Sequence, residues 1–317
     1  MRRKAIVLGA ILAAAVFARP VRASGFQIPP EAAHALDQTY SGDSDAAIAT
    51  ARRIESEQPQ SPLGFLLEAE ADWWKTYCAA CEMKWGMLDA WKHPKSPEDD
   101  AYFALADKAI GLAQAQLAKS ETAEMHLYAG LGLALKARLY GLRDEKRATA
   151  HAGVAARAEF VRALQLDPDL TDATAALGFY NYYVDTLSAV AKMLRFFMGI
   201  PGGNKEDGIR QMQEGADRGV LLAVDSRFYL AKNLRTYDQR YTDALRIAEP
   251  LVARYPHNPT FLLFLGNLNA ELGRNAKAAE YLHAILGPPG AADPDSACLA
   301  RARDLANSLL ASLHGAQ

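Results

Sequence analysis

Alanines and prolines recur along this chain at fixed positions relative to one another. Ala244 and Ala278 are separated by 34 residues, and a period of this length is typical of arrays of helical hairpins, each built as helix, turn and helix. The recurring positions are Ala156, Phe160, Ala163 and Pro168, then Ala244, Leu251 and Pro256, then Ala278 and Ile285. Since each hairpin can bury its apolar face only against its neighbours, the pattern predicts one continuous helical stack.

The segment from Ala156 to Pro168 resembles the second helix of a tetratricopeptide repeat, and Leu262 to Leu282 resembles a whole hairpin of that family. The resemblance implies an all-α fold, a right-handed superhelical solenoid of antiparallel helix hairpins. We expect a single domain over residues 24–317. Its expected parts are weak repeats over 30–120, clear repeats over 123–286 with a polar loop over 141–150, and a capping helix over 296–313.

A second resemblance rests on three short stretches, residues 178–180, 199–203 and 208–212. Their glycines and aromatic residues are faintly similar to a eukaryotic repeat family associated with mitochondrial outer membranes and inclusion-body clearance. That family brings no settled chemistry to transfer, so the resemblance adds nothing to the functional expectation beyond a repeat fold.

The first 23 residues have the features of a secretory signal peptide. Arg2, Arg3 and Lys4 precede an apolar run over residues 5–18, and small side chains near Ala23 suit signal peptidase. Removal of five basic residues lowers Lys+Arg from 35 to 30 against 37 Asp+Glu, so the formal net charge changes from -2 to -7. We therefore expect export, to the periplasm of a bacterial cell envelope or as a secreted protein, and an acidic mature chain argues against a nucleic-acid partner.

First helices line the groove of a tetratricopeptide stack, so the repeat positions predict which side chains face it. The predicted groove residues are Phe179, Tyr182, Tyr183, Tyr229, Asn233, Tyr237, Phe264, Asn267 and Glu271. Aromatic side chains anchor partners, and asparagine amides both donate to and accept from a peptide backbone. The sequence thus favours an exported, non-catalytic scaffold that binds a protein or peptide and needs no cofactor. The other interpretation is that these side chains are core, covered by long first helices or by an insertion at 184–203.

Two cysteines three residues apart offer the one alternative chemistry. Cys78 and Cys81 fall on one face of a helix, and three readings stay open: a disulfide between them, a pair of buried thiols or half of a metal site, and a redox pair. The alternative function is thus an envelope redox or metal-linked accessory protein. Cys298 is expected to be an apolar filler near the capping helix.

No catalytic constellation is visible in the sequence. The seven histidines are scattered without the i, i+4 pairing that favours a helical metal site, and we predict neither an enzyme nor a metal centre. Residues 184–200 have apolar positions at helical spacing. Such a helix can lie on a membrane as a peripheral contact or pack inside the stack.

Overall fold

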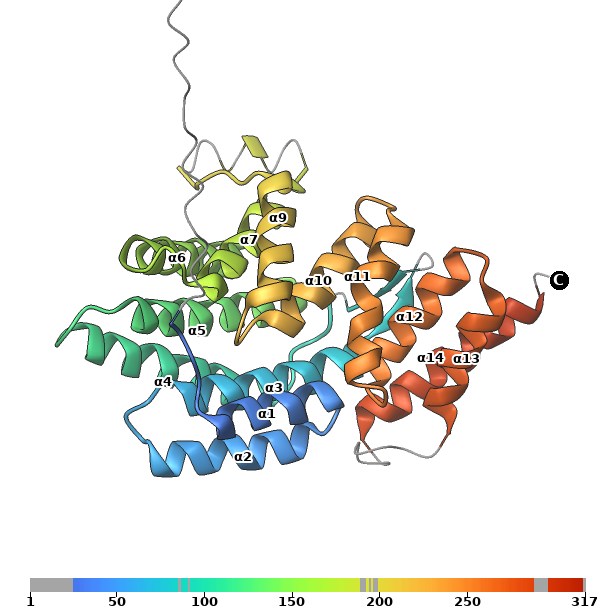
Figure 1. Ribbon diagram of the computed structural model, residues 1–317, viewed down its shortest axis with the longest axis horizontal. Coiled ribbons are helices and arrows are strands. Elements are labelled where there is room, and N and C mark those ends of the chain that lie inside the picture. Colours follow the sequence, from blue (N-terminus) through green and yellow to red (C-terminus); the bar gives the residue numbers. More distant parts are fainter. Residues whose placement is uncertain are drawn as a thin grey trace, which may run out of the picture.

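The computed structural model describes residues 25–84, 87–90, 92–188, 192–193, 195, 199–287 and 296–315. This part of the chain contains thirteen helices and one two-stranded sheet, so the expected all-α class is confirmed apart from that sheet (Figure 1). The helices are α1 (Pro30–Ser41), α2 (Ser44–Glu57), α3 (Leu63–Ala80), α4 (Asp99–Leu117), α5 (Ala123–Leu142), α6 (Lys146–Leu166), α7 (Thr171–Asp185), α9 (Lys205–Arg218), α10 (Ala223–Thr236), α11 (Tyr241–Arg254), α12 (Pro259–Glu271), α13 (Asn275–Leu286) and α14 (Ala297–Gly315).

Consecutive helices pack against one another along the whole described chain, which is the arrangement expected of stacked hairpins. Side-chain caps begin several of these helices. Asp43, Thr122, Asn204 and Asn258 each accept a hydrogen bond from a backbone N–H in the first turn that follows. Four alanines of the recurring pattern, Ala156, Ala163, Ala244 and Ala278, are all buried.

Two glycines let α7 and α9 approach closely. A Cβ atom on Gly178 would lie 2.9 Å from the backbone nitrogen of Met212, and one on Gly208 would lie 2.7 Å from that of Tyr182. Neither backbone can move far in a packed helix pair, so these two positions require glycine.

The polar loop expected over residues 141–150 is much shorter in the structure. Helix α5 continues to Leu142 and α6 begins at Lys146. The additional residues therefore lengthen both helices instead of the connection between them.

Helix α3 lies against both halves of the stack. It contacts α1, α2, α4, α5 and also α14, the last helix of the chain (Figure 1). Its aromatic side chains enter the core of the C-terminal hairpins, where Trp74 packs edge-on against Phe228 at 5.1 Å and Phe261 at 5.5 Å between ring centroids. The first part of the chain thus supplies core for the last.

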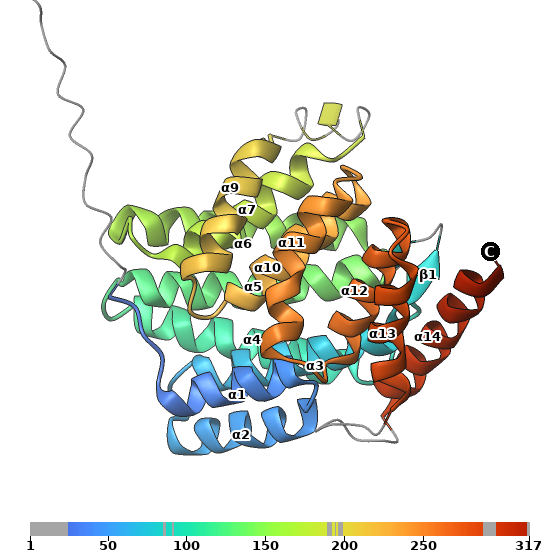
Figure 2. The same cartoon turned by 45° about the vertical axis from the view of Figure 1, so that its right-hand side comes forward.

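An antiparallel hairpin follows α3, formed by β1 (Glu82–Lys84) and β2 (Met87–Asp89). Glu82 pairs with Asp89, and Met83 with Leu88. Strand β2 contacts α12, and the hairpin lies near α12 and α14 (Figure 2). The sequence did not predict these strands. The hairpin and α3 together cover side chains of α7, α10 and α12 that would otherwise be exposed.

Candidate functional site

Most of the predicted groove residues are buried. Tyr182, Asn233 and Phe264 have no exposed surface, and Asn267 and Tyr229 are 2% and 7% exposed. The expectation of an open groove at these positions is therefore wrong. The interpretation in which these side chains are core holds for the buried ones, and the described residues that cover them include a different segment from the one expected.

The cover is α3 and the hairpin. The indole N–H of Trp73 donates to the Tyr229 hydroxyl at 2.9 Å, and the amide of Asn267 donates to the sulfur of Met83 at 3.6 Å. Both contacts join the start of the chain to helices more than 150 residues later. The groove side chains therefore bind a segment of their own chain.

The remaining predicted residues lie nearer the surface. Tyr237 is 52% exposed at the end of α10, with its ring 6.1 Å from that of Tyr182. Glu271 forms an ion pair with Arg235 at 2.8 Å, and Phe179 is half-buried against Tyr229. Tyr237 is thus the groove residue best placed to meet a partner.

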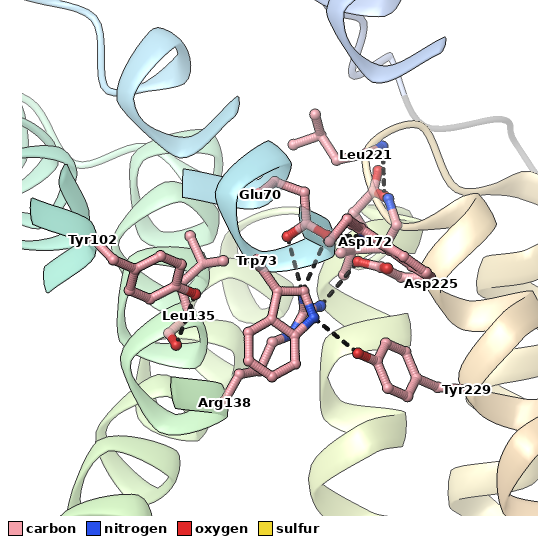
Figure 3. Close-up of polar contacts among 11 residues, drawn as sticks. Glu70, Trp73, Tyr102, Leu135, Arg138, Asp172, Leu221, Asp225 and Tyr229 are labelled. Atoms are coloured by element: carbon pink, nitrogen blue, oxygen red, sulfur yellow. Dashed lines mark hydrogen bonds and ion pairs between the residues drawn. The ribbon is translucent and has the colours of Figure 1, made fainter. Parts of the chain in front are cut away.

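Beside this face, α3, α5 and α10 meet around the guanidinium of an arginine whose side chain is 20% exposed. Arg138 of α5 reaches between Glu70 of α3 and Asp225 of α10, at 2.8 Å and 2.9 Å (Figure 3). Glu70 also accepts from the indole of Trp74 at 2.9 Å, and Arg138 lies over the rings of Trp73 and Tyr229. We call Glu70, Arg138 and Asp225 the Arg138 cluster.

The loop before α10 is fixed by a second carboxylate. Asp172 is fully buried at the start of α7 and accepts the backbone N–H groups of Val220, Leu221 and Leu222 at 2.8–3.1 Å (Figure 3). Asp225 follows in the first turn of α10, where the helix dipole favours a negative charge. This geometry holds Asp225 opposite Arg138.

The Arg138 cluster contains one cation and two carboxyl groups. Burial acts to lower the pKa of Arg138, but the attraction of Glu70 and Asp225 raises it by more, so the guanidinium stays charged. Burial raises the pKa of Glu70, Arg138 opposes this, and the neighbouring Asp225 raises it further. The pKa of Glu70 in the folded protein therefore lies above its ordinary value.

A cavity of about 40 Å³ lies beside the cluster, lined by Glu70, Arg138 and nine apolar residues. That space has room for a few water molecules and is far below the roughly 300 Å³ of a small-molecule site. We therefore regard the Arg138 cluster as a brace that joins three helices.

A second buried ion pair joins the hairpin to α10. The ammonium of Lys232 lies 2.9 Å from Asp89 Oδ1, and the two side chains are only 9% and 10% exposed. The Tyr77 hydroxyl donates to the same oxygen at 3.2 Å, and Lys232 also lies over the rings of Tyr77 and Tyr229. Burial acts to lower the pKa of Lys232, and Asp89 with two tyrosines raises it by more. We call Lys232 and Asp89 the Lys232 pair.

The cysteines pair differently from the expectation. Cys78 forms a disulfide with Cys298 of α14, with their Cα atoms 5.0 Å apart, and Cys81 is a buried free thiol. The predicted Cys78–Cys81 bond is therefore wrong, as is the filler role of Cys298. Cys81 lies beyond the end of α3 in extended backbone, so it has left the helical face that carries Cys78. Burial raises the pKa of the Cys81 thiol, which makes it a poor nucleophile.

With Cys78 bonded to Cys298, Cys78 and Cys81 do not form a pair with each other. In the described residues no group of three or more histidine, cysteine or acidic side chains is placed to hold a metal ion. No helix in the same part of the chain is both long and apolar enough to cross a bilayer.

Part of the proposed membrane-contacting segment, residues 184–200, lies outside the described residues, namely 189–191, 194 and 196–198. Within the described part, α7 ends at Asp185, and Leu187 and Met193 are 41% and 54% exposed.

Replacement of Glu70 by glutamine tests the protonation of the Arg138 cluster. A carboxyl group with a raised pKa in the folded state stabilises the fold below its unfolded pKa of about 4.3, and this contribution is lost as pH rises. Glutamine mimics the protonated acid and does not titrate. We therefore expect the free energy of unfolding of Glu70→Gln, relative to that of wild type, to increase by on the order of a few kcal/mol as pH rises from 5 to 8. Urea denaturation across this range measures it, and parallel pH profiles would contradict it.

Some of the buried charged residues, which the predicted groove did not include, could have been recognised from the sequence. Arg138 lies between Ala137 and Leu139, and Lys232 follows the apolar residues 228–231, whereas Glu70 alternates with other acidic residues and carries no such signal. A charge in such a position is buried only when it is paired, so each one predicts a partner. The partners themselves, Asp225 and Asp89, could not be assigned from spacing.

The chain matches no protein-family model and no curated protein. The face formed by α7, α10 and α12 is therefore the basis for a functional proposal.

Proposed function

We propose that this chain is an exported, non-catalytic scaffold of the tetratricopeptide kind, with its hairpins wound into a right-handed superhelix, that binds a protein or peptide partner. The observation that carries the proposal is the face of α7, α10 and α12, which already holds the hairpin as an extended segment. Aromatic rings, amides and a paired ammonium on one rigid face are suited to peptide recognition.

Two features support export. Residues 1–23 have the composition of a signal peptide. The Cys78–Cys298 disulfide suits an oxidising compartment, since bonds of this kind are rare where thiols are kept reduced.

Site-specific photo-crosslinking tests the scaffold function. A benzophenone amino acid at Tyr237, the exposed residue at the edge of this face, should give a defined adduct in the native envelope fraction. The same group at Glu249, an exposed position on α11, is the matched control. The partner identified should then bind the purified chain saturably. Equal adducts from both positions, or none from either, would contradict the proposal.

A further inference from the structure

We infer that Lys232 is the anchor for a carboxylate on an extended partner segment, and that Asp89 of the hairpin occupies this anchor until such a segment displaces it. The inference rests on the proposed function and specifies its partner, an acidic peptide segment. Three observations support this inference: the contacts made by α10, the contacts made by the hairpin, and the way the two ends of the hairpin are attached.

The anchor is a buried cation whose positive charge has to be balanced by a nearby anion. Lys232 is 7% exposed, it forms an ion pair with Asp89, and aromatic rings flank it. An ammonium left in such a place without an anion costs several kcal/mol. Any segment that replaces the hairpin must therefore bring a carboxylate of its own.

A second group on the same helix has unused binding capacity. Asn233 is fully buried, and its side-chain oxygen accepts from the Tyr183 hydroxyl at 3.1 Å. Its amide nitrogen has no hydrogen-bond acceptor among the described residues. A buried donor without a partner is costly, and a carbonyl from an incoming segment would satisfy it.

The hairpin is held at its ends independently of the Lys232 pair. Before it, the Cys78–Cys298 disulfide fixes the end of α3, and Arg301 of α14 donates to the carbonyl of Cys81 at 2.6 Å. After it, the backbone N–H of His93 donates to the carbonyl of Leu142 at 2.9 Å. The strands can therefore leave the face while both ends of the segment stay attached.

The occupant indicates the preferred partner sequence. Asp89 supplies the carboxylate, and the adjacent Leu88 is 2% exposed. An aliphatic residue followed by an acidic one reproduces both contacts. Since a tethered segment competes at an effective concentration of roughly millimolar, a free peptide binds well only when the hairpin is weakened.

The test uses the mature, oxidised chain and a fluorescein-labelled peptide with the sequence of residues 81–92, carrying serine in place of Cys81. We expect Asp89→Asn to bind this peptide at least about tenfold more tightly than wild type in fluorescence anisotropy, because the competing carboxylate is gone. A peptide with asparagine in place of Asp89 should not bind Asp89→Asn more tightly than it binds wild type. Lys232→Met should abolish binding of both peptides, and Lys277→Met, an exposed site on α13, should behave as wild type.

Equal affinity of wild type and Asp89→Asn, or equal binding of the two peptides, would overturn the inference. If Asp89→Asn is not folded by circular dichroism, hydrogen exchange on wild type decides: saturating peptide should speed exchange of the amides at 87–90, and unchanged rates would overturn it. A natural partner that crosslinks at Tyr237 in Lys232→Met as well as in wild type would overturn the anchor and leave the scaffold function standing. If the peptide binds tightly but no partner is found in the envelope fraction, the scaffold function is overturned and the anchor stands.

Discussion

Replacement of Arg138 by methionine is expected to lower the free energy of unfolding by roughly 3–5 kcal/mol, because it leaves two carboxyl groups buried without a cation. Glu70 and Asp225 are 12% and 0% exposed, and both accept from the guanidinium that is lost. Methionine preserves much of the volume, so the loss reports charge more than packing. Urea denaturation at pH 7 measures it.

Two further variants separate charge from packing in this experiment. Arg210→Met removes an arginine that is 72% exposed and paired with Asp207, and it should cost about 0–1 kcal/mol. Adding Glu70→Gln and Asp225→Asn to Arg138→Met should recover much of the loss, since no buried charge then remains. A loss that persists in the triple variant would assign the effect to packing instead.

The helical framework could be predicted from local pattern. Ala156, Ala163, Ala244 and Ala278 are buried as the repeat pattern predicts, because helix periodicity and small side chains at close contacts are properties of neighbouring residues. The lengths of the helices were harder to predict. Residues 141–142 and 146–150 are helical and only 143–145 form the turn, since exposed polar positions are compatible with helix and loop alike.

The candidate site could be predicted only in part, because its decisive contacts are distant in sequence. The inward positions of Tyr229, Asn233 and Asn267 followed from the repeat, but their occupants, Trp73 and the hairpin, come from a segment more than 140 residues earlier. Nothing local specifies that α3 turns into this face. The same limit explains why Cys78 was assigned to the nearer Cys81.

Loss of the Cys78–Cys298 disulfide is expected to destabilise the chain by about 3–5 kcal/mol. The bond closes a loop with a sequence separation of 220 residues, and the chain-entropy model gives about 5 kcal/mol for a loop of this length, with measured values often smaller. Cys78→Ser combined with Cys298→Ser should therefore show a lower urea midpoint than wild type under oxidising conditions. With reductant present, the two proteins should converge.

The pairing itself is checked by mass spectrometry after digestion with trypsin under non-reducing conditions. Trypsin cleaves after Lys75, Lys84, Lys277 and Arg301, so we expect the peptide 76–84, which carries both Cys78 and Cys81, to be linked to 278–301. Cys81→Ser should keep this link, because its thiol is not part of the bond. A monomeric peptide 76–84 that is 2 Da lighter than its reduced form would instead identify a Cys78–Cys81 bond, and helix α14 would then be joined to α3 by packing and hydrogen bonds alone.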